Sequence, residues 1–327
     1  MITMVIVDGQ LSTEYSPPNV IVADLKNISP MQADLIQQYF PQAMLDQSGL
    51  FIHVPANIQC ALHLKFITTA QNDLLLQPQN YFIFDENSSI NLLVEHIDIF
   101  SQRCYINTLN AIHVGKNATV DYSKITHASA RTIRFTNTFI QQKQQSHVQL
   151  NHFVFNNAYS RDDVAIALQE PQAICETRGF YVTRQDHEFV DHQIFVDHQA
   201  PTCKSDMLYK GILQNKSRAD FNGKVLVRPA AQKTEAHQAN HHLLLSQHAA
   251  ANAKPELEIY ADDVRCKHGA TVGELDKEAL FYLCSRGISH EEATQLLLGG
   301  FAAEVLQRVT HPMTAEYVRN VALAGQL

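Results

Sequence analysis

"NLLVEHIDIF", residues 91–100, has the period of a β-strand. Successive side chains of a strand point to opposite faces, so residues two apart share a face. The stretch therefore divides into two sets: Leu93, Glu95, Ile97 and Ile99 on one face, and Leu92, Val94, His96 and Asp98 on the other. Neither set is purely polar. The alternation predicts a strand in this part of the chain.

Comparable runs of β-branched and aromatic residues fill the middle of the chain: YFIF (81–84), YINTLNAIHV (105–114), RTIRFTNTFI (131–140), HVQLNHFVF (147–155) and HEFVDHQIFVDH (187–198). A β-sandwich, a barrel and a parallel β-helix all fit such a succession. Hairpins favour Asn-Gly or Asp-Gly turns, and the sequence has these only at Asn222-Gly223 and Asp8-Gly9. We therefore expect a parallel β-helix, with turns of about 20–25 residues.

Helical patterns occur at the two ends. Near the start, Pro30 follows Ser29 at a plausible first helical position. Near the end, three helices are predicted. The first spans 276–286, with Asp276 as its N-cap and Gly287 just past its end. The second runs from 289 to about 309 and begins with a Ser289–Glu292 capping box, and the third runs from Thr314 to about Ala324, after a break at Pro312. The predicted division is an N-terminal segment with one short helix (1–48), a β core (49–275) and a helical module (276–327).

Composition limits the class of protein. The chain has 327 residues, a formal net charge of −8 and 45% hydrophobic residues. This balance argues against binding of duplex nucleic acid, which favours a basic face. The start MITMVIVDGQ lacks the pattern of a secretion signal, and the six cysteines are scattered singly. We expect reduced thiols in a cytoplasmic protein, with no transmembrane helix.

Several catalytic motifs are absent from the sequence: the P-loop, GxGxxG after a strand, GxSxG and HExxH. The chain is therefore not expected to bind ATP by a P-loop. The paired carboxylates Asp162-Asp163 and Asp262-Asp263 are interpreted as solvated turns.

Histidines recur in two segments. Asp-His pairs stand at 186–187, 191–192 and 197–198, and they are interpreted as polar residues at exposed strand corners rather than as a metal array. His237 and His241 would share a face of a helix, but they lie among strands, where i and i+4 are about 13 Å apart and too distant for one metal.

The segment YADDVRCKHGATVG, residues 260–273, places Cys266 and His268 two residues apart. In a strand these side chains point the same way, about 7 Å apart. Thiolate and imidazole suit zinc and iron–sulfur sites, but two ligands do not close a site. The residues alone leave two interpretations open: a metal half-site completed from elsewhere, or an inert buried thiol, which is the better supported of the two.

A longer stretch carries a resemblance. LEIYADDVRCKHGATVGELDKEALFYLCSRGISHEEATQLLLGGFAAEVL, residues 257–306, resembles the C-terminal signature of the SufB/SufD iron–sulfur cluster assembly proteins. The segments 228–259, 49–59 and 5–16 resemble the same family. Lys267 directly after Cys266, and the run KHGATVGELD, are most similar to the SufD branch. Relative to that branch, the chain is expected to lack most of the N-terminal helical region.

The resemblance implies a mainly β fold: a right-handed parallel β-helix with a small C-terminal helical module and a short N-terminal helical segment. It implies a non-catalytic scaffold that pairs with a SufB-like homologue through the β-helix and with a SufC-like ABC ATPase through the C-terminal helices. A transient iron–sulfur cluster would form at the subunit interface, with His268 and Cys266 as this chain's metal half-site. ATP would be bound by the partner, and the resemblance leaves flavin binding open.

Two other functions remain open. A β-helix enzyme such as a polysaccharide lyase would be expected to show a secretion signal and a carboxylate cluster for calcium, and neither is evident. A structural homodimer without cluster chemistry is plausible because a surface that accepts a homologue can accept itself. Neither function requires membrane or nucleic-acid partners.

Overall fold

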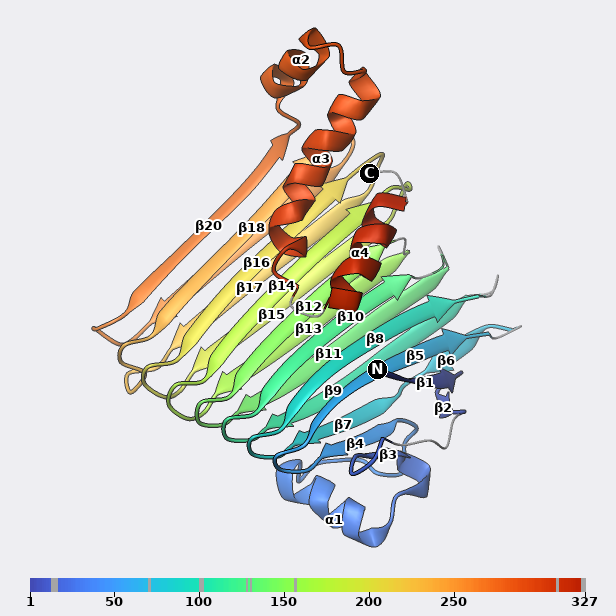
Figure 1. Ribbon diagram of the computed structural model, residues 1–327, viewed down its shortest axis with the longest axis vertical. Coiled ribbons are helices and arrows are strands. Elements are labelled where there is room, and N and C mark those ends of the chain that lie inside the picture. The colour runs from blue at the N-terminus through green and yellow to red at the C-terminus, as the bar shows by residue number, and fades with distance from the viewer. Residues whose placement is uncertain are drawn as a thin grey trace.

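Two large sheets form the body of the protein (Figure 1). The computed structural model describes residues 1–12, 17–69, 72–99, 103–127, 129, 131–155, 158–309 and 312–324. Sheet A contains, in spatial order, β2 (Gln10–Leu11), β1 (Ile2–Val7), β5 (Gln59–Thr68), β8 (Ser89–Asp98), β10 (Thr119–His127), β12 (His147–Phe155), β14 (Ile174–Thr183), β16 (Lys204–Leu213), β18 (Glu235–Leu244) and β20 (Arg265–Glu274). Sheet B contains β19 (Ala250–Ile259), β17 (Arg218–Val227), β15 (Phe189–His198), β13 (Tyr159–Leu168), β11 (Thr132–Gln142), β9 (Cys104–Val114), β7 (Gln79–Phe84), β4 (Leu50–Val54) and β3 (Ile21–Asp24), with β6 (Leu74–Leu76) beside β9.

Successive long strands alternate between the two sheets and pair in parallel with the strand one turn away. Only β1–β2 and β3–β4 pair antiparallel among the described strands. The chain is thus a parallel β-solenoid, and the predicted mainly β fold with helices at both ends is confirmed. Phe100, at the end of the run that suggested a strand, lies outside the described residues.

The predicted turn length of 20–25 residues is wrong. Asn80 Nδ2 donates to Asn110 Oδ1 30 residues further on, 2.8 Å away, and Ser89 pairs with Thr119 in the same register. Each turn is longer because it contains two strands of about ten residues, such as β8 and β9, and two corners. The solenoid is therefore flattened between two sheets.

One row of corners uses a left-handed residue in place of a hairpin turn. Asn57, Asn87 and Asn117 have φ values of 63°, 57° and 56°. Asparagine tolerates this conformation better than most non-glycine residues. Their side chains also bond from turn to turn, because Asn117 Nδ2 donates to Asn87 Oδ1 at 3.0 Å. These corners explain why the fold needs few Asn-Gly turns.

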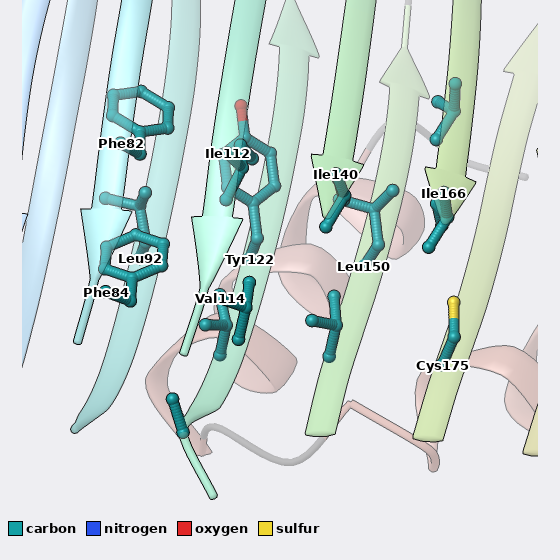
Figure 2. Packing of buried hydrophobic residues seen from close by; sticks show 14 of the residues in the cluster. Phe82, Phe84, Leu92, Ile112, Val114, Tyr122, Ile140, Leu150, Ile166 and Cys175 are labelled. Atoms are coloured by element: carbon teal, nitrogen blue, oxygen red, sulfur yellow. The ribbon is translucent and has the colours of Figure 1, made fainter. Parts of the chain in front are cut away.

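The main apolar core lies between the sheets (Figure 2). Leu92 and Leu150 reach into it from sheet A, and Phe82, Ile112 and Ile166 from sheet B. Their burial supplies the dominant driving force for stacking the turns, at about 25 cal/mol per Å² of apolar surface.

Helices cover parts of the outer faces. They are η1 (Leu25–Asn27), α1 (Pro30–Tyr39), α2 (Lys277–Ser285), α3 (His290–Leu306) and α4 (Pro312–Ala324). The N-caps Ser29, Asp276 and Ser289 are confirmed. α1 lies against sheet B at the N-terminal end, α3 and α4 lie across sheet A, and α2 projects beyond the end of β20 (Figure 1).

The C-terminal helix boundaries differ from the prediction. α3 ends at Leu306, three residues before the expected position. Pro312 begins α4 instead of breaking the chain ahead of a Thr314 cap, because proline lacks only an N–H that the first helical turn leaves unbonded anyway. Among the helices described, none has the length and apolar character needed to cross a membrane.

Candidate functional site

Cys266 and His268 lie on β20, the last strand of sheet A. Their register partners on β18 are Ala236 and Gln238, both buried toward the solenoid interior. Cys266 and His268 therefore stand on the inward-facing side of β20. Cys266 packs partly against the apolar core, and this burial raises the pKa of its thiol. His268 is exposed.

The end of the solenoid that carries this pair is open. β20 and β19 are the outermost strands of the two sheets, so one edge of each has no neighbouring strand within the described part of the chain, as Figure 1 shows for β20. Apolar side chains are uncovered there, with Val272 46% exposed and Tyr260 62% exposed. Natural proteins usually protect long edge strands, because an open edge is a template for pairing with another chain.

Within the described part of the chain, no third His, Cys, Asp or Glu converges on Cys266 and His268 to make a three-ligand group. Residues i and i+2 of a strand are about 7 Å apart on the same face. The pair can therefore contribute two donor atoms to a site at this edge, one thiol and one imidazole. The remaining donors of such a site would have to come from outside the described residues.

The Asp-His pairs do not behave as the sequence suggested. Asp186 and His187 lie at a corner, as expected. The other two pairs lie within β15, where His192 and His198 are both fully buried. The interpretation as exposed corners is wrong for these two pairs, because the ten-residue strands extend through positions that local polarity assigned to turns.

The two carboxylate pairs lie in different environments. Asp262 and Asp263 are exposed in a bend, as predicted. Asp162 and Asp163 lie within β13 instead of a turn. Asp163 pairs with Arg161 at 2.8 Å on the outer face, whereas Asp162 is buried in the interior. The solvated-turn interpretation of Asp162 is therefore wrong.

A buried cluster that the sequence did not single out contains Asp162. His152, Asp162 and His192 bring one possible ligand atom each to within 4.8 Å of one another. The Nζ of Lys124 contacts Asp162 Oδ1 in the same layer. The signal in the sequence was weak. His152 and Asp162 each stand on the face of their strand on which residues two positions away are apolar.

His237 and His241 lie on β18, so the predicted strand environment is confirmed. His237 is exposed, and His241 Nδ1 lies 2.8 Å from Thr271 Oγ1 on β20. Neither histidine belongs to a three-ligand group among the described residues.

The helices at the open end present apolar surface. Phe281 and Tyr282 of α2 are 75% and 57% exposed, and Leu296 of α3 is 57% exposed. A shallow pocket beside Leu296 is lined mainly by α3 residues, including Gly299 and Ala303. This surface lies on the part of the helices that does not contact sheet A.

Comparisons with known proteins place this architecture in a family. Residues 66–301 match the SufBD core domain of the SUF system for FeS cluster assembly. An iron–sulfur cluster assembly SufBD family protein of Synechocystis is 28% identical over 336 residues, covering 94% of this chain and 74% of that protein.

Two SufD proteins are also similar. The iron–sulfur cluster assembly protein SufD of Escherichia coli is 31% identical over 216 residues, covering 66% of this chain and 51% of that protein. SufD of Bacillus subtilis is 26% identical over 318 residues, covering 91% of this chain and 72% of that protein. The matched core domain contains most of the solenoid, all of α2 and most of α3. The chain therefore belongs to the SufBD family of SUF iron–sulfur cluster assembly proteins.

Proposed function

We propose that this chain is a non-catalytic scaffold subunit for iron–sulfur cluster assembly, completed by a SufB-like homologue at the open end of the solenoid. The observation that carries the proposal is the uncovered edge of β19 and β20, because Cys266 and His268 lie on β20, a strand with one free edge. A second solenoid aligned there would extend the sheets and bury the exposed apolar side chains.

In this proposal the nascent cluster is the cargo. Cys266 and His268 supply a thiolate and an imidazole, both suitable donors to iron. The homologue supplies the remaining donors, so neither chain closes the site alone. Separation of the two chains would then open the site for release of the cluster.

The proposed partner for α2 and α3 is a SufC-like ATPase. Supporting this, Phe281 and Tyr282 of α2 and Leu296 of α3 are exposed apolar side chains. Aromatic residues in such surfaces commonly carry much of the binding energy. Nucleotide-dependent movement of the ATPase would then bias the interface between closed and open states.

The test is anaerobic reconstitution of the chain co-expressed with SufB-like and SufC-like partners. We expect the purified complex to show visible absorption that is lost or strongly reduced in His268→Ala. His237→Ala is the matched control, because His237 is exposed on the neighbouring strand and its register partner is Lys267, not His268. Unchanged absorption in His268→Ala would overturn the half-site.

The outcome for the assembly is a separate readout. If the chain co-purifies with neither partner and forms a dimer alone, the open edges pair with a second copy. The structural homodimer would then replace the proposed heteromeric complex.

A further inference from the structure

One layer of the solenoid interior is polar although the layers on either side are apolar. On β12, His152 stands between Leu150 and Val154, which point into the interior. On β15, His192 stands between Val190 and Ile194 in the same way. The register places five polar side chains at this level, Lys124 of β10 and His152 of β12 from sheet A, and Thr136 of β11, Asp162 of β13 and His192 of β15 from sheet B.

The three side chains converge. One ligand atom each from His152, Asp162 and His192 lies within 4.8 Å of the others. His192 Nδ1 is 3.7 Å from Asp162 Oδ2. The ring centroids of His152 and His192 are 5.9 Å apart, and the two ring planes are inclined by 23°. All three residues are at most 2% exposed.

Several atoms at this point lack hydrogen-bond partners. They are His152 Nδ1, Asp162 Oδ2 and both ring nitrogens of His192. Buried polar atoms are almost always satisfied in folded proteins, so a group of unsatisfied atoms facing one another requires an explanation. A metal ion, which accepts several lone pairs at once, would satisfy these atoms together.

The protonation states match a metal site. Burial lowers the pKa of His152 to about 3 and that of His192 to about 4, so both imidazoles are neutral donors. Burial alone would raise the pKa of Asp162, but the Lys124 ammonium outweighs this effect, so the pKa is lowered and the carboxylate stays ionised. The set is two neutral nitrogens and one carboxylate oxygen.

We propose that His152, Asp162 and His192 bind one divalent first-row transition metal ion, such as Zn²⁺ or Fe²⁺, inside the solenoid. Two imidazoles and a carboxylate are a ligand set that both ions accept. The ion would connect β12 of sheet A to β13 and β15 of sheet B. This site is separate from Cys266 and His268 and does not depend on the proposed function.

Binding of a metal ion would require the three ligand atoms to move closer together. Metal–ligand bonds of about 2.0–2.1 Å place tetrahedral ligand atoms roughly 3.4 Å apart. The present separations lie within 4.8 Å. Rotation of the imidazoles toward the carboxylate would bring the ligand atoms closer.

Lys124 competes with the metal for the same carboxylate. Its ammonium contacts Asp162 Oδ1 and places a positive charge beside the site. Lys124→Met removes both effects and retains similar volume, and a bound divalent cation replaces the ammonium as the charge that keeps Asp162 ionised. We therefore expect this variant to bind the metal at least tenfold more tightly than the wild type.

The experiment uses the full chain carrying Cys60→Ser, Cys266→Ser and Cys284→Ser, so that the partly exposed thiols make no contribution. The protein is refolded anaerobically with Co²⁺ as the probe, because a buried site exchanges slowly in the folded state. Bound metal is counted by elemental analysis, and the visible d–d absorption of Co²⁺ reports its geometry.

We expect one tightly held equivalent in this chain and a loss of at least tenfold in affinity in His152→Gln and His192→Gln. His198→Gln is the matched control, because His198 is equally buried on the same strand and bonds to Ser205 Oγ at 2.9 Å. Equal cobalt binding in all variants, or none in the refolded chain, overturns the proposal and leaves a buried Lys–Asp pair. If His192→Gln does not fold, failure of Lys124→Met to tighten binding overturns it as well.

Discussion

Glu95 illustrates how one side chain connects distant parts of the molecule. It projects from the outer face of β8 and accepts hydrogen bonds from His63, at 3.0 Å, and from the Tyr317 hydroxyl of α4. Lys65 lies 3.5 Å from the same carboxylate. Burial alone would raise the pKa of Glu95, but these partners lower it to about 2.

This pKa predicts a pH-dependent contribution to stability. A depressed folded pKa stabilises the protein above the unfolded value of about 4.3, and the contribution is lost as pH falls toward 2. After allowing for solvent screening, we expect Glu95→Gln to reduce the free energy of unfolding by about 1–2 kcal/mol at pH 7. The difference from wild type should shrink between about pH 4.5 and 2. Urea titrations across that range measure it.

Glu86→Gln is the control for this prediction, because Glu86 is exposed at a corner. A Glu95→Gln effect that stays constant down to pH 2.5 would show that the carboxylate contributes by packing and not by charge.

At this scale the sequence predicted some residues and missed others. Cys266 and His268 were found because a local spacing of two is visible in one strand. Asp162 was assigned to a turn because its meaning depends on Lys124, 38 residues earlier, and on His192, 30 residues later. Local polarity does not reveal contacts between turns of a solenoid.

Among the elements, the corners carry a testable constraint. Asn87 has a φ of 57° and bonds to asparagines on both adjacent turns. A β-branched residue is strained in this conformation by about 1–2 kcal/mol. We expect Asn87→Val to lower the free energy of unfolding by that amount, measured by urea denaturation. Asn87→Gly should lower the free energy of unfolding by less than half as much as Asn87→Val. An equal loss in the two variants would show that the side-chain hydrogen bonds of Asn87 contribute more than its backbone conformation.

Helix α3 offers a comparison of two leucines. Leu298 is 1% exposed against sheet A, whereas Leu296 is 57% exposed on the same helix. We expect Leu298→Ala to cost about 2–4 kcal/mol of stability and Leu296→Ala to cost less than about 0.5 kcal/mol. Thermal unfolding measures both. If Leu296→Ala is the more damaging, the helix is seated on the sheet by its other face.

The element pattern explains why the turn length escaped prediction. Asn57, Asn87 and Asn117 do recur every 30 residues. Later corners place other residues in the left-handed conformation, at Gln145, Gln172, Thr202 and Lys233. The corner requires a backbone conformation and not a particular side chain. The repeat therefore degenerates in sequence while it persists in structure, whereas the helix caps, which depend on specific side chains, were recognised directly.

For the whole molecule, the open end predicts that backbone amides differ in their protection from hydrogen exchange. Amides at the free edges of β19 and β20 have no neighbouring strand among the residues that the structure describes, whereas interior strands such as β12 are paired on both sides. We expect the free-edge amides to exchange hydrogen fastest among the long strands of the isolated chain and to gain protection when a SufB-like partner binds. Mass spectrometry of exchanged peptides measures this. Protection of both strands in the isolated chain at micromolar dilution would contradict an unpaired edge.

The return of α3 and α4 across sheet A has a consequence for biosynthesis. Turns of the solenoid can stack one after another as they leave the ribosome, since each contacts mainly its neighbours. The apolar outer face at Phe155, however, is covered by helices whose residues are made about 140 positions later, around Leu298. At about 5–20 residues per second that surface stays bare for roughly 7–30 s. A nascent chain of this protein should therefore be a client of chaperones that shield apolar sheets until translation is nearly finished.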